Sequence, residues 1–398
     1  MAVRSRQIIA GGTVVTPSEI IESGTVVIED GKIVEVDDVP RSCGAAGEWH
    51  DARGAWVLPG LIDTHSDAIE LELEPRPNCT LPLSISFAEL ERKLAGQGIT
   101  TIHHALCLLG DEGESVRSND RVGSLIRAIR QLTRGRRLIR HYIHLRFEIT
   151  NRSAVPLVEQ LIEGKVVDLL SFTDHTPGQG QFRDFEVQVR LTRARDGLSD
   201  EQARQRLEAR MNLPKIDPST LEDIAAKARK RGIPIASHDD DSIEKLDVAE
   251  SWHASICEFP VSLPVAIEAK RRGLLVAMGA PNVLLGRSHS NNVSALEALR
   301  HGAVDILCSD YYPPSLIQSV FALFRKGYDM RQAVNLVSYH PARALGMAEA
   351  VGSISPGKVA DVLIVREDEG TPVIEKVFVG GVLACQMTYQ ARGVLEAL

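Results

Sequence analysis

The chain has 398 residues, 44% of them hydrophobic and 25% charged, and its formal net charge is -8. This length and composition indicate a folded protein with one large domain and a smaller companion, and they exclude a disordered or fibrous chain. The mild negative charge argues against a nucleic-acid-binding protein. No apolar run reaches the ~18 residues of a membrane span, and the N-terminus lacks an apolar signal core, so we expect a cytoplasmic protein without membrane contact.

Both ends of the chain have the pattern of β-structure. Near the N-terminus, short β-branched runs recur at 7–9, 12–15, 25–29 and 32–36. The dipeptide Asp30-Gly31 lies between the last two runs and predicts a hairpin. Near the C-terminus, similar runs at 361–365 and 376–379 follow glycine-containing turns. We therefore predict a small β-sandwich domain built from residues 1–57 and 346–398.

The middle of the chain, residues 58–345, alternates short apolar runs with amphipathic stretches. The strand candidates are 57–62, 99–102, 141–149, 166–172, 233–236, 255–259, 274–278 and 304–308. Eight alternating units predict a TIM (β/α)8 barrel, regular or distorted, while an open doubly wound sheet is the alternative. The barrel is favoured because polar residues follow most of the strands, as a ring of active-site loops requires.

One segment, about 184–231, interrupts this rhythm because it is long, helical and rich in arginine. A capping-box pattern at Ser199 to Gln202 predicts a helix that runs to Arg210. The segment is either a solvated helical insertion or a lid that contributes arginines to an anionic substrate. The sequence leaves both interpretations open.

The end of the first barrel strand carries the most specific local pattern. Residues 59–67 read Pro-Gly-Leu-Ile-Asp-Thr-His-Ser-Asp. His65 and Asp67 are two positions apart and share a strand face, so both can ligate one metal. In the third strand, alternation places Arg146 and Glu148 on one face. A carboxylate at the end of that strand, Glu148, could bridge two metal ions; the alternative is an exposed Arg146–Glu148 ion pair.

Three later strands each end in one residue of a type that binds metals. His175 and His238 each follow an apolar strand, and Asp310 ends the last one. One such histidine is more often structural, but repeated placement in an alternating chain indicates a site. Imidazoles and carboxylates suit zinc, manganese, iron or nickel. Two such ions about 3.5–4 Å apart would lower the pKa of a bound water, and Asp310 is the predicted catalytic base.

These features resemble the amidohydrolase superfamily over nearly the whole chain. The resemblance includes the 59–65 run, the single histidines, Asp310, the closing motif at 352–361 and the split β domain. The chain departs from the commonest pattern because its first motif is His-x-Asp rather than His-x-His. In addition, no lysine is placed to bridge two metals, so Glu148 takes that position.

The departures resemble one branch, the PhnM-like diphosphatases of phosphonate degradation by the C–P lyase pathway. Matching stretches lie at 65–67, 75–77, 144–146, 174–179, 236–240, 279–282, 288–290 and 309–313. The resemblance implies two divalent ions, zinc first, held by His65, Asp67, Glu148, His175, His238 and Asp310. It also implies hydrolysis of α-D-ribose 1-methylphosphonate 5-triphosphate to the 5-phosphate and pyrophosphate.

A small-molecule polyphosphate requires cations and N–H donors around its oxygens. The candidates for substrate binding are Arg76, Arg146, Gln179, Gln181, Asn282, Arg287, Ser288 and His289. The 286–292 loop could equally be an ordinary polar turn, and Arg76 could form a structural salt bridge. We expect His103, His104 and His340 to be packing residues or to lie behind the ligands.

Two other functions remain open. A C–N hydrolase of the same superfamily, acting on a cyclic amide, an N-acyl group or an amine, would use the same metals and Asp310. A non-catalytic barrel scaffold predicts missing ligands, whereas all six positions here carry competent residue types. For its assembly we expect a homodimer, the commonest soluble oligomer.

The six cysteines are scattered and form no Cys-x-x-Cys pair. This spacing favours reduced thiols that serve mostly as packing groups.

Overall fold

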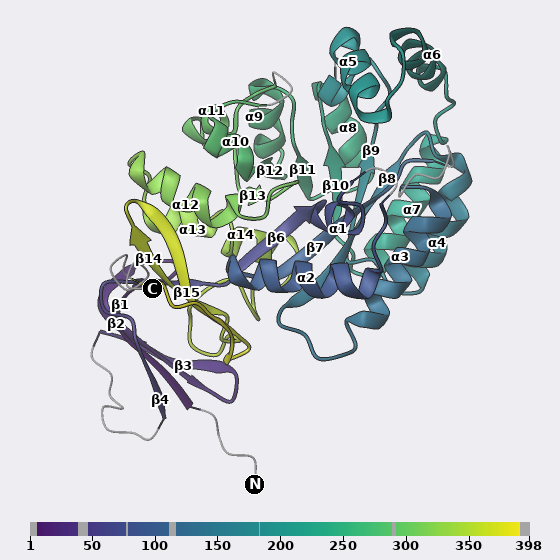
Figure 1. Cartoon of the computed structure of the whole chain (residues 1–398). Helices are drawn as coiled ribbons and strands as arrows, with labels where there is room; N and C mark the ends of the chain where they lie inside the picture. The colour runs from purple at the N-terminus through teal and green to yellow at the C-terminus, as the bar shows by residue number, and fades with distance from the viewer. Residues whose placement is uncertain are drawn as a thin grey trace. The chain divides into compact units, whose positions relative to one another are not determined.

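The computed structural model describes residues 6–38, 47–76, 79–110, 117–182, 184–288 and 292–390. Within these residues, strands from both ends of the chain form one eight-stranded sheet (Figure 1). Its strands are β1 (Arg6–Val15), β2 (Ile20–Glu29), β3 (Lys32–Asp37), β4 (Glu48–Asp51), β5 (Trp56–Pro59), β14 (Val362–Asp368), β15 (Thr371–Val379) and β16 (Val382–Gln386). Their order is β16-β15-β14-β5-β1-β2-β3, and β4 pairs with β1.

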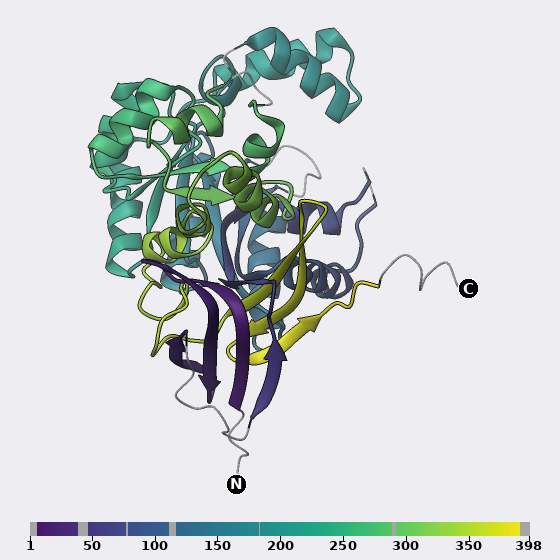
Figure 2. The same cartoon turned by 90° about the vertical axis from the view of Figure 1, so that its left-hand side faces the viewer.

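This terminal sheet follows from the sequence pattern. The predicted hairpin forms between β2 and β3, which pair antiparallel. Asp30 and Gly31 both have positive φ angles, 49° and 80°, as the tight turn between two twisted strands requires. Alternate side chains from both chain ends bury one core, which includes Ile9, Val26 and Phe378. The purple and yellow strands of this sheet lie side by side in Figure 2.

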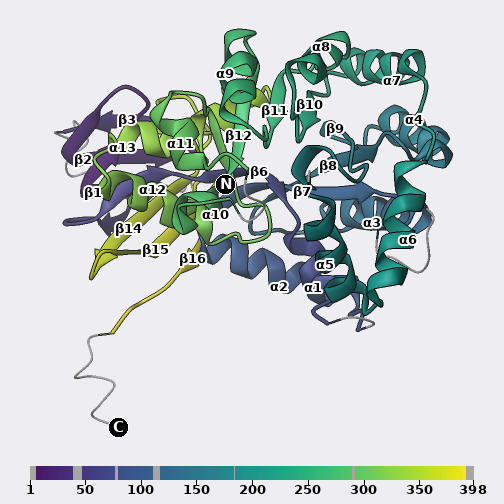
Figure 3. The ribbon, with the colours of Figure 1, turned by 90° about the horizontal axis from the view of Figure 1, so that it is seen from above.

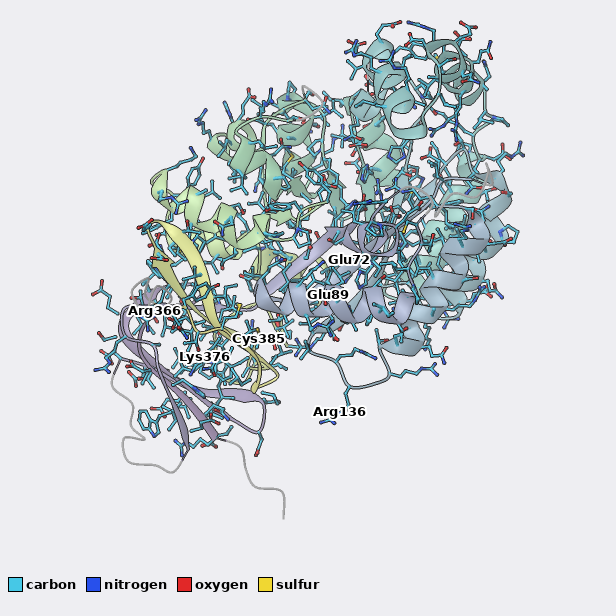
Figure 4. The ribbon with its side chains drawn as sticks, viewed as in Figure 1. Glu72, Glu89, Arg136, Arg366, Lys376 and Cys385 are labelled. Carbon is cyan, nitrogen blue, oxygen red and sulfur yellow. The ribbon has the colours of Figure 1, made fainter. Side chains whose placement is uncertain are left out.

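Polar groups at the edge of this core are paired. His50 is buried, and its Nε2 lies 2.6 Å from the Oε1 of Gln7. Lys376, labelled in Figure 4, donates to the Nδ1 of His50 at 3.0 Å. Arg366, also labelled there, donates to Glu375 at 2.6 Å. Because each of these groups has a partner, the small sheet buries polar atoms at little cost.

The second sheet is the predicted barrel. Its strands are β6 (Leu61–Ser66), β7 (Ile99–Leu108), β8 (Arg140–Glu148), β9 (Leu169–Thr173), β10 (Ile235–His238), β11 (Ile256–Glu258), β12 (Leu275–Gly279) and β13 (Ile306–Cys308). They are ordered in space as in sequence, from β6 to β13. A parallel bridge between Ser66 and Asp310 joins the two ends of this series. The TIM-barrel fold with a β domain from both termini is therefore confirmed.

One predicted strand is two strands. We expected a single barrel strand over 57–62, but β5 belongs to the terminal sheet and β6 to the barrel. Gly60 separates them, and its N–H donates to the carbonyl of Asp361 at 3.0 Å. A Cβ at Gly60 would lie 2.4 Å from the Oγ1 of Thr100, so only glycine fits this transfer between sheets.

Helices follow most barrel strands. They are α1 (Ala68–Leu73), α2 (Leu83–Gly96), α3 (Asn119–Leu132), α4 (Val155–Glu163), α5 (Phe185–Asp196), α6 (Asp200–Met211), α7 (Pro218–Lys230), α8 (Ile243–Ser251), α9 (Leu263–Arg271), α10 (Ala280–Leu285), α11 (Ala295–Arg300), α12 (Ser315–Arg325), α13 (Met330–Asn335) and α14 (Tyr339–Ala344). Two 3₁₀ turns are η1 (Arg152–Ala154) and η2 (Gly180–Phe182). In α3, Val122, Ile126 and Ile129 are buried at helical spacing, so one apolar face packs inward.

The predicted insertion at 184–231 contains three helices with two roles. α7 packs against α4 and β10, as a regular barrel helix does. α5 and α6 form an extra hairpin (Figure 3) that closes on its own small core of Val189, Ala203 and Leu207. The predicted capping box is present, because Ser199 and Gln202 exchange side-chain and backbone hydrogen bonds.

Two compact units are distinguished in the chain. The first comprises 1–102, 136–141 and 308–398, and the second comprises 103–135 and 142–307. These units differ from the division at 57/58 and 345/346, which follows the two sheets and stays a prediction. In the described part of the chain, every helix is too short or too polar to cross a bilayer.

The described cysteines are free thiols. Cys107, Cys257 and Cys308 are buried packing groups, whereas Cys79 is exposed and Cys385 is half-buried. Cys43 lies outside the described residues.

Candidate functional site

Three predicted ligands meet in the first unit, and we call them the Asp310 half-site: His65, Asp67 and Asp310. The Nε2 of His65 lies 3.9 Å from the Oδ1 of Asp67. The backbone N–H of Asp310 donates to the carbonyl of His65 at 2.9 Å, and that of Asp67 donates to the carbonyl of Asp310 at 2.7 Å. The end of β6 and the segment that follows β13 are thus joined by main-chain hydrogen bonds.

A buried carboxylate lies directly behind this half-site. Asp63 is fully buried and accepts from the backbone N–H of Ser309 at 3.0 Å and from its hydroxyl at 2.6 Å. The Oγ of Ser66 lies 2.9 Å from the Oγ of Ser309, and the N–H of His65 contacts Asp63 at 3.4 Å. Burial raises the pKa of Asp63 to about 6, against hydrogen bonds from Ser309 that lower it. Neither Asp63 nor Ser309 was among the predicted site residues.

Four residues form the His175 half-site in the second unit: Glu148, His175, His238 and Asp239. The Oε2 of Glu148 lies 2.6 Å from the Nδ1 of His175, and its Oε1 accepts from the backbone N–H of His175 at 3.0 Å. Thr173 also donates to Glu148, at 3.2 Å. The carboxylate therefore fixes the orientation of the imidazole and leaves Nε2 as the metal-binding atom.

The His175 half-site fits a divalent metal. Ligand atoms of His175, His238 and Asp239 all lie within 4.8 Å of one another. The Nδ1 of His238 is 3.1 Å from the Oδ2 of Asp239, which is 3.8 Å from the Nε2 of His175. Two imidazoles and a carboxylate suit a transition metal such as zinc. Asp239 was not among the predicted ligands. In this arrangement Glu148 holds a ligand, and its predicted bridging role stays a prediction.

A second buried acid–base pair lies in the barrel strands of this unit. The Nε2 of His144 is 2.6 Å from the Oγ of Ser171 and 3.5 Å from the Oε2 of Glu258. Glu258 is in register with His238 across β10 and β11, so both project from the same face. Glu258 is fully buried. It was missed although it lies next to the end of the predicted strand 255–259, where a charged residue indicates a site.

The loop that carries His175 is tied to its surroundings. Asp174 accepts from Thr176 and, at 2.7 Å, from the Nζ of Lys215. Burial alone would raise the pKa of Asp174, but these hydrogen bonds lower it below its ordinary value. Further along, the N–H of Gly180 donates to Asp241 at 2.6 Å. These contacts hold the loop from both sides.

The other predicted substrate-binding residues lie in several places. Arg146 is buried in β8, in register with Ser171. Gln179 and Gln181 belong to the His175 loop and are half-buried. The remaining members are Arg76, which is exposed in the first unit, and, in the second unit, half-buried Asn282 on α10, exposed Arg287 and buried Ser288. His289 lies outside the described residues.

Two arginines of the α5–α6 hairpin pair with carboxylates of the same hairpin. Arg193 donates to Asp200 at 2.8 Å, and Arg204 donates to Glu186 at 2.7 Å. These pairs favour the solvated insertion over the lid. His103 and His104 are buried in β7, and the His103 ring stacks on Tyr142 at 4.9 Å, which agrees with a packing role.

Comparison with known proteins agrees with this architecture. A model described as the amidohydrolase family matches residues 181–384. The chain is 33% identical over 369 residues to an α-D-ribose 1-methylphosphonate 5-triphosphate diphosphatase of Escherichia coli K12, covering 92% of this chain and 96% of that protein. It is 26% identical to an imidazolonepropionase of Pseudomonas fluorescens Pf0-1, covering 86% and 87%. A dihydropyrimidinase from Brevibacillus agri NCHU1002 has a TM-score of 0.61 at 15% identity, covering 95% and 94%.

Proposed function

This chain belongs to the amidohydrolase family, and we propose that it hydrolyses the triphosphate of α-D-ribose 1-methylphosphonate 5-triphosphate. The observation that carries the proposal is the 33% identity to a diphosphatase of that substrate along 92% of the chain. The coarser conclusion, a hydrolase of the amidohydrolase superfamily, does not depend on the choice of substrate.

We further propose that the two half-sites supply the ligands of two divalent metal ions, with zinc as the first candidate. The proposed ligands are His65, Asp67, Glu148, His175, His238 and Asp310. Asp239 and Glu258 are additional candidates, because one contributes to the His175 cluster and the other is a buried carboxylate in register with His238. Divalent ions at such a centre lower the pKa of a coordinated water and offset phosphate charge.

In the proposed reaction, Asp310 orients the attacking water and accepts its proton. Water adds to a phosphorus atom, the bridging P–O bond between the α- and β-phosphates breaks, and pyrophosphate leaves from the ribosyl 5-phosphate. Arg146 is the buried cation of the candidate set and would contact nonbridging oxygens. Gln179 and Gln181 would add N–H donors from the His175 loop, with Ser288 as a buried hydroxyl donor.

We also propose that the partner is a small-molecule polyphosphate, that the assembly is a homodimer and that the location is cytoplasmic. Arg76, Asn282, Arg287 and His289 complete the proposed substrate-binding set, each through a cation or an N–H donor.

A C–N hydrolase is the second candidate function. The 26% identity to an imidazolonepropionase over 86% of the chain favours it. A cyclic amide needs few cations around it, whereas a triphosphate needs several, so the two functions differ in the demands they place on Arg146 and Arg287.

The test is pyrophosphate release by the zinc-loaded protein from α-D-ribose 1-methylphosphonate 5-triphosphate. ATP, imidazolonepropionate and a dihydropyrimidine are assayed in parallel, with metal content measured on the same sample. Rapid release from the ribosyl substrate alone supports the proposal. Turnover of either cyclic amide without pyrophosphate release would replace it with the C–N hydrolase.

A further inference from the structure

We propose that Asp63 is a positioning residue that acts through Ser309 to fix the direction of the Asp310 carboxylate. This inference rests on the proposed role of Asp310 as base and metal ligand. It adds a function for two side chains that the sequence pattern did not single out. We refer to Asp63 and Ser309 together as the clamp.

The backbone at Asp310 needs support. Asp310 has φ of +56°, in the left-handed region, where a residue other than glycine is held by its surroundings. Its N–H and carbonyl are both engaged, with His65 and Asp67. These two bonds fix the position of the peptide, but the direction in which Asp310 leaves β13 also depends on the residue before it, which is Ser309.

Asp63 holds Ser309 at two atoms. One carboxylate oxygen accepts from the Ser309 N–H at 3.0 Å, and the other accepts from the Ser309 hydroxyl at 2.6 Å. The hydroxyl oxygens of Ser309 and Ser66 also lie 2.9 Å apart. Asp63, Ser66 and Ser309 therefore form one buried polar group.

The position of Asp63 couples the clamp to the ligands. Asp63 and His65 are two residues apart on β6, so one strand carries both a ligand and the group that holds the Asp310 segment. The N–H of His65 also contacts Asp63, at 3.4 Å. A displacement of β6 would therefore move His65 and Ser309 together, which keeps His65 and Asp310 in register.

A purely structural role for Asp63 would be limited to closing the barrel between β6 and β13. The two roles predict different effects of removing the Ser309 hydroxyl. Loss of a structural bond lowers stability and leaves turnover per folded molecule unchanged. Loss of positioning lowers kcat with little change in KM, and the loss disappears once Asp310 has been disabled.

The experiment compares Ser309→Ala with Ser319→Ala, in zinc-loaded and cobalt-loaded protein. Ser319 is the matched control because it is a fully buried serine of the same unit whose hydroxyl donates to the carbonyl of Leu316 at 2.8 Å. We expect Ser309→Ala to lower kcat by about 10- to 100-fold with KM unchanged. We expect the same thermal shift in both variants, and no further loss when Ser309→Ala is added to Asp310→Asn. Asp63→Asn should behave like Ser309→Ala.

The cobalt absorption spectrum gives a readout that does not depend on turnover, because it reports the geometry of the ligands. A changed spectrum in Ser309→Ala, but not in Ser319→Ala, supports the clamp. An unchanged spectrum, a kcat equal to that of the control, or an additive loss in the Asp310→Asn background overturns it. Failure of the wild-type protein to release pyrophosphate would instead reject the proposed substrate, and the kinetic comparison would then use the cyclic amide that is turned over.

Discussion

The two half-sites hold their ligands by different means. In the Asp310 half-site, the ligands are joined by main-chain hydrogen bonds, and the buried Asp63 carboxylate supports them from behind. In the His175 half-site, side chains hold one another: Glu148 orients His175, and Asp239 contacts both His175 and His238. One geometry is therefore set by backbone and the other by acid–imidazole pairs.

This difference predicts which substitutions each half-site tolerates. Main-chain bonds survive most substitutions, so the backbone of the Asp310 half-site should keep its position when a ligand side chain is changed. The His175 half-site, which is held by side chains, should lose metal affinity when a single carboxylate is changed, because that carboxylate fixes the orientation of an imidazole ligand. Substitutions in the two half-sites distinguish these two means of support, and we expect the largest effect at Asp310.

Asp310→Asn should lower kcat by roughly 10²- to 10⁴-fold, because the amide cannot accept the proton that the proposed base takes. Its backbone bonds to His65 and Asp67 do not involve the side chain, and asparagine tolerates the same left-handed φ. Circular dichroism should therefore be unchanged. Asp329→Asn, the same substitution at the N-cap of α13, is the control. Near-normal turnover in Asp310→Asn would exclude Asp310 as the base.

Glu148→Gln should lower metal affinity by about 10- to 100-fold, because the amide is a weaker acceptor for the Nδ1–H of His175. Competition with a chelator, followed by metal analysis, measures the change. Glu159→Gln is the control, since Glu159 is a half-exposed partner of Lys227 on a nearby helix of the same unit. Equal affinities in the two variants would contradict the proposal that Glu148 orients a ligand.

Lys215→Met should reduce kcat/KM a few-fold, since Lys215 holds Asp174, the neighbour of His175. Lys227→Met is a close control because the two ammonium groups are similarly exposed, at 47% and 43%. Both ion pairs are solvent-exposed and contribute little to stability, so the urea midpoints of the two variants should hardly differ. A loss of kcat/KM in both variants would show a general charge effect instead of a local one.

The smallest expected effect is on the stability of the protein in mild acid, and it comes from His50 in the terminal sheet. Burial, together with the neighbouring Lys376, lowers the pKa of His50 below its ordinary value of 6.5. The unfolded chain therefore binds a proton that the folded chain resists, and this part of the stability is complete above about pH 6.5 and is lost as pH falls through the folded pKa. In His50→Gln, the urea midpoint should fall less between about pH 7.5 and about pH 5.5 than it does in the wild-type protein. If the midpoint of that variant falls as steeply as that of wild type, His50 makes no contribution.

Much of the fold could be predicted because local patterns determine it. The alternation of residues 58–345 predicted the barrel, and Asp30-Gly31 predicted the first hairpin. The same patterns identified His65, His175 and His238 at strand ends. They could not separate β5 from β6, because the interruption depends on the close approach of Thr100 to Gly60, which is a tertiary contact.

Two of the missed residues, Asp63 and Glu258, have partners that are distant in sequence. Asp63 is informative only once Ser309 is beside it, and Glu258 only once β10 and β11 are in register. Asp239 directly follows the predicted ligand His238, and strand alternation would place the two side chains on opposite faces. Its φ of +56° turns it toward His238 and His175.

The terminal sheet has a consequence for the order in which the protein folds during synthesis. β14 pairs with β5, although the two strands are about 300 residues apart in the chain. While the ribosome makes the barrel, the β5 edge therefore has no native neighbour, and an unpaired edge invites association with other chains. The nascent protein must protect this edge until the last strands emerge, and such distant pairing is entropically slow. A helper that binds extended apolar segments would be needed most in that interval.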